Sequence, residues 1–224
     1  MFECIILAGG FGTRLKELSG KIPKPMMQVG NEPFLYILMK KLEMQGCCKI
    51  VLSLHYGANY IIDKVNRDRP VNCAVEFCVE PKPLGTGGAI KLSSKHITSD
   101  KFIALNGDSY CDVDYHEVWK ETLVSNLLLV ATSVSNVERF GKLQIDEQNK
   151  IFGLSEKTST GPGFINAGIY GIDKQIISST TELSFSFEND FLPVHLDKCK
   201  AMKVHKIFVD IGIPDDYHYA KQIL

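Results

Sequence analysis

Residues 3–14 read Glu-Cys-Ile-Ile-Leu-Ala-Gly-Gly-Phe-Gly-Thr-Arg, and this stretch decides the fold. Residues 3–8 are almost all apolar and predict a buried first strand, because strands covered on both faces form continuous apolar runs. Three glycines follow at once, in the position where α/β proteins bind phosphate. Glycine lets backbone N–H groups approach phosphate oxygens closely, and Arg14 offers a forked donor for them. The stretch therefore predicts an α/β protein with a phosphate-binding loop after its first strand.

This loop matches neither of the two common phosphate-binding patterns. A dinucleotide-binding GxGxxG would need glycine at position 15, which is leucine, and no Gly-Lys-Ser/Thr follows as in a Walker A loop. The alternative interpretation is a tight strand-to-helix turn that binds nothing. Three glycines with a threonine and an arginine in six residues favour phosphate binding.

Apolar runs alternate with amphipathic segments through the first half, which favours a parallel, doubly wound sheet. There we expect strands at 49–54, 74–79 and 101–105, and helices at 31–46, at 58–66, directly after glycines 85–88, and at 114–124. In the second half we expect strands at 127–133, 142–145, 151–155, 164–172 and 202–209, and helices at 173–179, at 188–196 and from residue 214. No linker-like stretch divides the chain, so we expect one domain over residues 1–224.

The composition excludes several classes of protein. Of 224 residues, 45% are hydrophobic and 23% are charged, and the net charge of −1 disfavours a dedicated nucleic-acid or membrane-surface binder. The longest apolar runs are far shorter than the ~20 residues that span a bilayer, and the N-terminus does not resemble a signal peptide. Seven cysteines are scattered without a CxxC pair, so we expect reduced, buried thiols in a cytoplasmic protein.

A second notable segment is Ile22-Pro23-Lys24-Pro25-Met26. Prolines on both sides fix the backbone, so Lys24 is presented with less loss of conformational entropy than a free surface lysine. Taken alone, Lys24 is equally well explained as a solvated loop lysine.

Together these two segments resemble the opening signature of the sugar-1-phosphate nucleotidyltransferases. The similarity continues, in the family's order, through Leu84-Gly85-Thr86-Gly87-Gly88, Asn106-Gly107-Asp108, Glu156-Lys157, Asn166-Ala167-Gly168 and Val209-Asp210-Ile211-Gly212. Each motif is weak alone, but six in sequence are specific and cover almost the whole chain. The resemblance implies a three-layer αβα sandwich with a Rossmann-like, mixed, mostly parallel sheet and no C-terminal β-helix.

The resemblance also implies which residues form the site. It gives Arg14 and Lys24 catalytic roles. It assigns nucleotide binding to Leu7, Ala8, Gly9, Gly10, Gly12, Thr13, Glu80, Leu84, Gly85, Thr86, Asn106 and Gly107. It assigns sugar-phosphate binding to Gly141, Glu156, Lys157, Asn166 and Gly168.

Asp108 and Asp210 are candidate metal ligands. Asp108 follows the strand expected at 101–105 and Asp210 follows the last expected strand, so both would reach the carboxyl edge of one sheet. Mg²⁺ is usually held by one or two carboxylates together with water and phosphate oxygens. Each aspartate alone is equally well explained as a turn residue or a helix cap, but the resemblance matches both to the family's Mg²⁺ ligands.

Glu80 bears on which base is bound. A carboxylate only accepts hydrogen bonds, so it can take both N1–H and the 2-amino group of guanine, whereas uracil and thymine present one donor between two carbonyls. The alternative is that Glu80 ends its strand in solvent and that backbone groups around Leu84 and Gly85 bind guanine.

The resemblance thus implies guanylyl transfer from GTP to a sugar 1-phosphate, releasing pyrophosphate and forming a GDP-sugar for cell-surface polysaccharide synthesis. The expected acceptor is D-glycero-α-D-manno-heptose 1-phosphate. Mannose 1-phosphate with GTP, or a hexose or amino-sugar phosphate with UTP, are alternatives, and a homo-oligomer is left open. Two further rivals are a glycosyltransferase, since Asp112-Val113-Asp114 is a DxD, and a non-catalytic subunit that senses nucleotide sugars.

Overall fold

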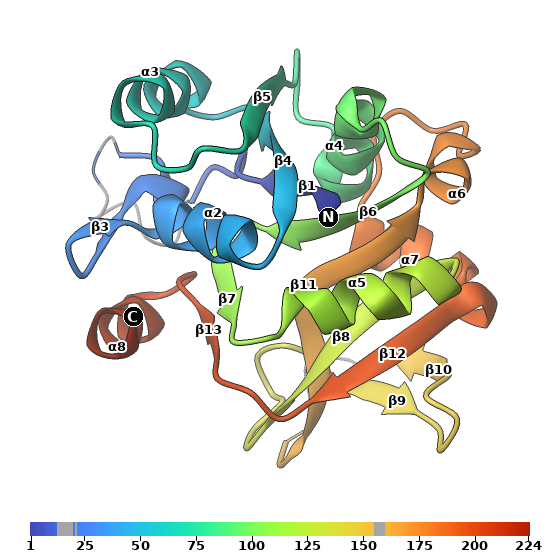
Figure 1. Ribbon diagram of the computed structural model, residues 1–224. Coiled ribbons are helices and arrows are strands. Elements are labelled where there is room, and N and C mark those ends of the chain that lie inside the picture. Colours follow the sequence, from blue (N-terminus) through green and yellow to red (C-terminus); the bar gives the residue numbers. More distant parts are fainter. Residues whose placement is uncertain (13–19, 21, 155–159) are drawn as a thin grey trace.

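The computed structural model describes residues 1–12, 20, 22–154 and 160–224, and within them a seven-stranded sheet forms the centre of the molecule (Figure 1). Its order in space is β12 (Cys199–Val204), β8 (Leu127–Val134), β11 (Gly163–Asp173), β6 (Lys101–Asn106), β1 (Phe2–Leu7), β4 (Cys47–Leu54) and β5 (Ala74–Val79). Neighbouring strands are parallel except at β11, which runs antiparallel to both β6 and β8. The expected mixed, mostly parallel sheet is confirmed.

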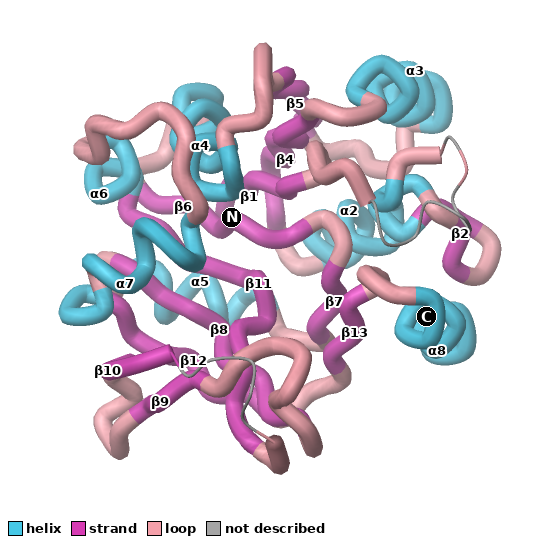
Figure 2. Tube along the Cα trace, turned by 180° about the vertical axis from the view of Figure 1, so that it is seen from behind, coloured by secondary structure: helices cyan, strands magenta, loops and turns pink. Residues whose placement is uncertain are grey.

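Helices cover both faces of this sheet (Figures 1 and 2). One face carries α2 (Phe34–Met44), α3 (Ala58–Asp68) and α5 (Tyr115–Val124). The opposite face carries α4 (Gly85–Ser93), α6 (Lys174–Ser178), the π-helical turn Phe187–Phe191 and α7 (Leu192–Val194). This is the three-layer αβα arrangement that we expected.

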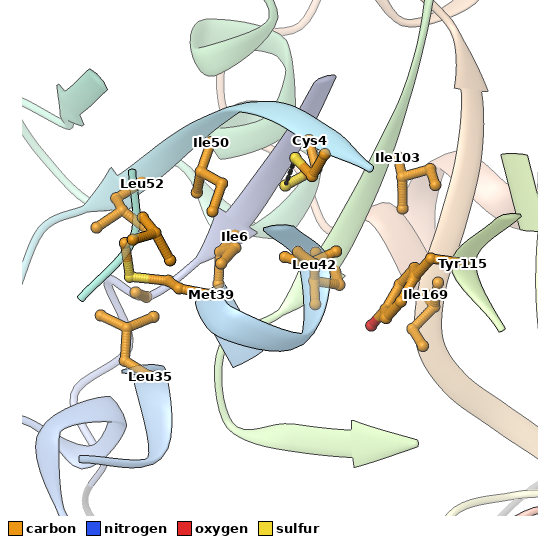
Figure 3. Close-up of a cluster of buried hydrophobic side chains, with 14 of the residues drawn as sticks. Cys4, Ile6, Leu35, Met39, Leu42, Ile50, Leu52, Ile103, Tyr115 and Ile169 are labelled. Carbon is orange, nitrogen blue, oxygen red and sulfur yellow. Dashed lines mark hydrogen bonds between the residues drawn. The ribbon is translucent and has the colours of Figure 1, made fainter. Parts of the chain in front are cut away.

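The strands contribute alternate side chains to two hydrophobic cores, one on each face of the sheet. In β1, Cys4 and Ile6 face the core under α2, whereas Ile5 faces the core under α4. Figure 3 shows the first core, where Met39 and Leu42 of α2 lie against the sheet. Full burial of an aliphatic side chain stabilises the fold by about 1.5–3 kcal/mol, so the apolar run at the N-terminus is held at the centre of the sheet.

Smaller elements lie outside the main sheet of the described residues. The ribbons are β2 (Gln28–Val29) with β3 (Glu32–Pro33), β7 (Ser109–Cys111) with β13 (Phe208–Asp210), and β9 (Leu143–Ile145) with β10 (Ile151–Leu154). The last helix is α8 (Pro214–Ile223), and short 3₁₀ turns occupy Lys24–Met26, Ser94–His96 and Leu196–Lys198. None of the helices in the described ranges has the length and apolar character needed to cross a membrane.

Two helix boundaries in the first half differ from our expectation. The helix placed at 31–46 begins only at Phe34, because Pro33 has an extended conformation and pairs with Gln28 in the β2–β3 ribbon. The glycines expected to precede the next helix instead form its first turn, since α4 begins at Gly85.

Two expectations in the second half are wrong. The helix expected at 188–196 is broken, because Pro193 lacks an N–H and its ring would clash with a carbonyl of a regular helix. A π turn at Phe187–Phe191 precedes Pro193, and in this turn the N–H of Leu192 bonds to the carbonyl of Phe187. The strand expected at 202–209 is divided: β12 ends at Val204, and Phe208–Asp210 leaves the main sheet to pair with β7.

Candidate active site

A cavity of about 380 Å³ opens where β5, β4, β1 and β6 end. These strands are parallel, so the residues that follow them meet at one edge of the sheet. Residues predicted from the sequence that line this cavity are Leu7, Gly9, Gly10, Gly12, Lys24, Glu80, Gly85, Thr86, Asn106 and Asp108.

Lys24 is held in place by the residues on either side of it. Pro23 packs so closely on Gly57, in the turn before α3, that a Cβ on this glycine would lie 2.3 Å from the proline ring. Pro25 and Met26 are buried, and the three residues from Lys24 form a 3₁₀ turn. Only 11% of the Lys24 side chain is exposed. Because the residues before and after Lys24 are packed in place, they hold its ammonium group in the cavity.

The ammonium group of Lys24 lies between the two predicted metal ligands. Its Nζ is 2.7 Å from Oδ2 of Asp108 and 3.6 Å from Oδ1 of Asp210. Among the described residues, one cation here faces two carboxylates, which leaves these three side chains with a net negative charge. A triphosphate would be repelled there unless further positive charge is supplied.

The two aspartates meet by a route that differs from our expectation. Asp108 follows β6 of the main sheet, but Asp210 is not at the edge of that sheet. It ends β13, which lies beside β7 (Figure 2) and pairs antiparallel with it. In this pairing Asp210 is opposite Ser109. The N–H of Ile211 also bonds to the carbonyl of Asp108 at 2.9 Å. A separate ribbon therefore brings the second carboxylate to the first.

The negative charge of the Asp210 carboxylate is only partly compensated by the groups around it. Burial, and then the negative charge of Asp108, raise the pKa of Asp210 above its ordinary value, while Lys24 and the backbone N–H of Gly212 lower it. Its Oδ1 is buried and has no hydrogen-bond partner among the described residues. Such an orphaned oxygen, beside a second carboxylate, is a donor set that suits Mg²⁺. No group of three or more potential metal ligands occurs in the described part of the chain.

The opposite end of the cavity holds Glu80, which directly follows β5. This residue is only 8% exposed, and burial raises the pKa of its carboxyl group. Its Oε2 accepts a hydrogen bond from the N–H of Leu84 at 2.9 Å, while its Oε1 faces Gly9 and takes no hydrogen bond from a described residue. Glu80 therefore does not end its strand in solvent, and the N–H of Leu84 is already bonded.

Several predicted residues lie directly behind the cavity wall. Ala8 and Gly107 bond through their N–H groups to Ser53 and Leu7 respectively, which fixes the spacing of the strand ends. Gly168 has a positive φ, and a Cβ there would lie 2.5 Å from Nδ2 of Asn106. Gly168 thus backs a residue of the wall.

None of the three described residues predicted for the sugar phosphate, Gly141, Asn166 and Gly168, lines this cavity. The amide of Asn166 bonds to the Tyr170 hydroxyl at 2.8 Å and to the N–H of Gly168 at 2.8 Å. Gly141 lies in a turn closed by its N–H and the carbonyl of Val137.

The Asp112-Val113-Asp114 segment has structural roles. Asp112 pairs with the buried Lys41 at 2.5 Å, Val113 is buried, and Asp114 caps α5 by accepting from the N–H of His116. None of the three lines the cavity. The DxD of the glycosyltransferase rival is therefore explained by the fold.

The family model described as "Nucleotidyl transferase" matches residues 3–224 of this chain. The chain belongs to the nucleotidyl transferase family. The family resemblance found in the sequence motifs is confirmed.

Relatives of this nucleotidyl transferase match it over nearly its full length. The D-glycero-alpha-D-manno-heptose 1-phosphate guanylyltransferase of Campylobacter jejuni is 34% identical over 220 residues, which are 97% of each protein. The crystal structure of HddC from Yersinia pseudotuberculosis has a TM-score of 0.93 and 48% identity, covering 99% of both chains. The same protein complexed with GMP-PN has a TM-score of 0.91, again with 48% identity and 99% coverage of both chains.

Four predicted residues of the nucleotidyl transferase site lie outside the described residues: Thr13, Arg14, Glu156 and Lys157. Conversely, our reading of the sequence missed seven lining residues, which are Phe11, Pro25, Ser53, His55, Pro83, Ala89 and Gly212. His55 could have been found, because it follows the second parallel strand as Gly9 follows the first.

Proposed function

We propose that this nucleotidyl transferase transfers a guanylyl group from GTP to D-glycero-α-D-manno-heptose 1-phosphate, releasing pyrophosphate. The observation that carries the proposal is one cavity with two chemically different ends, Glu80 at one and Lys24 between Asp108 and Asp210 at the other. The end with Glu80 suits the hydrogen-bond donors of guanine, and the end with Lys24 suits phosphates. Similarity to the guanylyltransferase of C. jejuni and to HddC supports the base and the sugar.

The nucleophile in this proposal is a phosphate oxygen of the sugar 1-phosphate, which attacks the α-phosphorus of GTP while the bond to pyrophosphate breaks. A phosphomonoester has a second pKa near ~6, so the nucleophile is already largely dianionic at neutral pH. The protein therefore needs no catalytic base. Its task is to bring two polyanions together in line and to neutralise the charge that develops.

Lys24 is the described residue best placed for that neutralisation. Its side chain is nearly buried and its loop is anchored by Pro23 on Gly57, so it loses little entropy on engaging a phosphate. The ion pair with Asp108 holds the ammonium group at the phosphate end of the cavity. Arg14 and Lys157 would add positive charge at the triphosphate and at the sugar phosphate, and Glu156 and Asn166 would bond sugar hydroxyls.

Asp108 and Asp210 would hold Mg²⁺, and the orphaned Oδ1 of Asp210 supports this assignment. The ion would supply positive charge that neutralises phosphate oxygens. The two carboxylates would hold the ion beside Lys24. The product would serve cell-surface polysaccharide synthesis, and we propose the cytoplasm as its site of formation.

A panel of sugar 1-phosphates tests the proposal. The protein would be given GTP and Mg²⁺ with D-glycero-α-D-manno-heptose, mannose or glucose 1-phosphate, and pyrophosphate release would be measured. We expect the highest kcat/KM with the heptose phosphate. A higher value with mannose 1-phosphate would contradict the sugar assignment. In a parallel incubation with a GDP-sugar in place of GTP, release of GDP would indicate a glycosyltransferase, and binding without turnover in either incubation would indicate a sensor.

A further inference from the structure

Phe11 is an exposed aromatic residue in the wall of the cavity. It lies between Gly10 and Gly12 in the first loop, and 55% of its surface is exposed. Large apolar side chains that are exposed in a concave site commonly mark a surface that a ligand covers. The mechanism proposed above gives this ring no role.

The ring of Phe11 is supported by two aromatic neighbours. Its centroid is 5.7 Å from that of His55, in an edge-to-face arrangement, and 5.6 Å from that of Tyr56. These neighbours are consecutive in the turn after β4, so they contact Phe11 from one region of the fold. His55 is itself fixed, because its Nδ1 lies 3.2 Å from the carbonyl oxygen of Glu80. A network of short contacts therefore joins Phe11 to the residue that we expect to read the base.

The order of the strands places Phe11 toward the base end of the cavity. Along the sheet edge, Glu80 follows β5, His55 follows β4 and the first loop follows β1, with Asp108 after β6 at the far side. Phe11 contacts the turn after β4. Gly12, the next residue, instead lies against Lys24: a Cβ built on Gly12 would be 3.0 Å from Cβ of Lys24. The loop thus turns its aromatic residue toward Glu80 and its glycine toward the phosphate end.

We propose that Phe11 is a stacking platform for the purine ring, which makes it a specificity-determining residue for the nucleotide. This inference rests on the proposed function and extends it. Glu80 would read the hydrogen-bonding edge of the base, and Phe11 would cover its face. A purine has a larger face than a pyrimidine, so the platform would favour GTP and ITP over UTP without distinguishing GTP from ITP. Glu80 would make that second distinction.

The test combines binding with turnover in matched variants. Dissociation constants of GMP, IMP and UMP would be measured by calorimetry for wild type, Phe11→Leu and Phe11→Tyr, together with kcat/KM for GTP, ITP and UTP. Tyr60→Leu is the control, because Tyr60 is an exposed aromatic residue on α3 that does not line the cavity. Leucine keeps an apolar side chain of similar length but has no aromatic face.

We expect Phe11→Leu to weaken GMP and IMP roughly 5- to 150-fold and equally, and to weaken UMP less, since base–aromatic stacking commonly has this magnitude. Phe11→Tyr and Tyr60→Leu should retain binding close to wild type. GMP binding by Phe11→Leu within about twofold of wild type would overturn the platform, because the lost stacking would then be too small to matter. Equal losses for GMP and UMP would also overturn it, because the ring would then act on the loop rather than on the base.

The same data separate this inference from the proposed function. If GMP binding depends on Phe11 but no sugar phosphate yields pyrophosphate, the proposed function fails and the platform stands. If GTP is turned over normally by Phe11→Leu, the platform fails and the proposed function stands.

Discussion

Nζ of Lys24 lies 2.7 Å from Oδ2 of Asp108, although 84 residues separate the two in the sequence. A lysine from the loop after β1 thus shares its charge with a carboxylate that follows β6. Asp210 approaches the same ammonium group at 3.6 Å from a third part of the chain. The end of the cavity that we propose for the phosphates is therefore formed by three segments of the chain, and each can be tested separately.

Replacement of Lys24 by methionine should lower kcat/KM for GTP by about 100-fold or more, because a positioned charge that stabilises the transition state typically contributes this much. Lys82→Met is a matched control. Lys82 also lies between two prolines, Pro81 and Pro83, but it is exposed and forms no ion pair with a described residue. Steady-state pyrophosphate release measures both variants. A comparable loss in Lys82→Met would show that general charge, rather than the position of Lys24, matters.

Asp108→Asn and Asp210→Asn should each lower kcat strongly at saturating Mg²⁺ while the fold remains intact. Asp215→Asn is the control, because Asp215 is exposed at the start of α8. In metal-free buffer, Asp210→Asn should also raise Tm, since the amide removes a partly buried charge that faces Asp108. Near-normal turnover in either variant would remove that aspartate from the metal site, and an unchanged or lower Tm for Asp210→Asn would contradict the charge argument.

Glu80→Gln should reduce the preference for GTP over ITP, because inosine lacks only the 2-amino group that the carboxylate is expected to accept. The glutamine oxygen can still accept from the N–H of Leu84, so the loop geometry is retained. A hydrogen bond to a charged group contributes about 1.5–3 kcal/mol, which corresponds to a change in the kcat/KM ratio of roughly 10- to 150-fold. An unchanged ratio would exclude a direct role for Glu80.

The same preference should depend on pH. Burial raises the pKa of Glu80, so the accepting carboxylate exists above this raised value and is lost as the pH falls through it. We expect the GTP-to-ITP ratio of wild type to fall on the acid side of neutrality, earlier than an ordinary glutamate would cause. GTP and ITP carry the same triphosphate, so protonation of the phosphates affects both kcat/KM values equally and does not change their ratio. Glu80→Gln should give a flat ratio, and a flat ratio in wild type would argue against the assignment.

Thiol alkylation of the native protein should modify Cys48 and leave activity largely intact. Cys48 is the exposed cysteine, whereas burial raises the pKa of Cys111 to about 11 and that of Cys199 to about 12. Mass spectrometry of protein treated with iodoacetamide would locate the label. Rapid inactivation that GTP prevents would contradict this prediction and place a reactive thiol at the cavity.

The first strand and its glycine loop could be predicted from the sequence because their signals are local, whereas the role of Lys24 comes from the family resemblance. A continuous apolar run indicates a central parallel strand, but two flanking prolines do not distinguish a site lysine from a solvated one. The sequence predicts that Asp108 and Asp210 lie close together, but not which strands bring them there. Asp210 reaches Asp108 because β12 ends at Val204 and the chain then pairs with β7 as β13. The pattern over residues 202–209 does not show that the strand is interrupted there.

Phe11 could not have been assigned from the sequence by the same reasoning. An isolated aromatic residue in a glycine loop has no periodicity, and its exposure depends on contacts with the turn after β4. Similarly, the π turn before Pro193 results from packing of Phe187 and Phe191 in the core, which a helical pattern does not distinguish from a regular helix.

The most direct test of guanylyl transfer follows the α-phosphate of GTP. The protein, Mg²⁺ and D-glycero-α-D-manno-heptose 1-phosphate would be incubated in parallel with GTP labelled with ³²P at the α- or at the γ-phosphate, and the products separated. We predict that the α-label appears in the sugar nucleotide and the γ-label in pyrophosphate. Both should form much more slowly with Lys24→Met and at a rate close to wild type with Lys82→Met. Recovery of the α-label in free GMP or GDP, with none in a sugar nucleotide, would contradict the account.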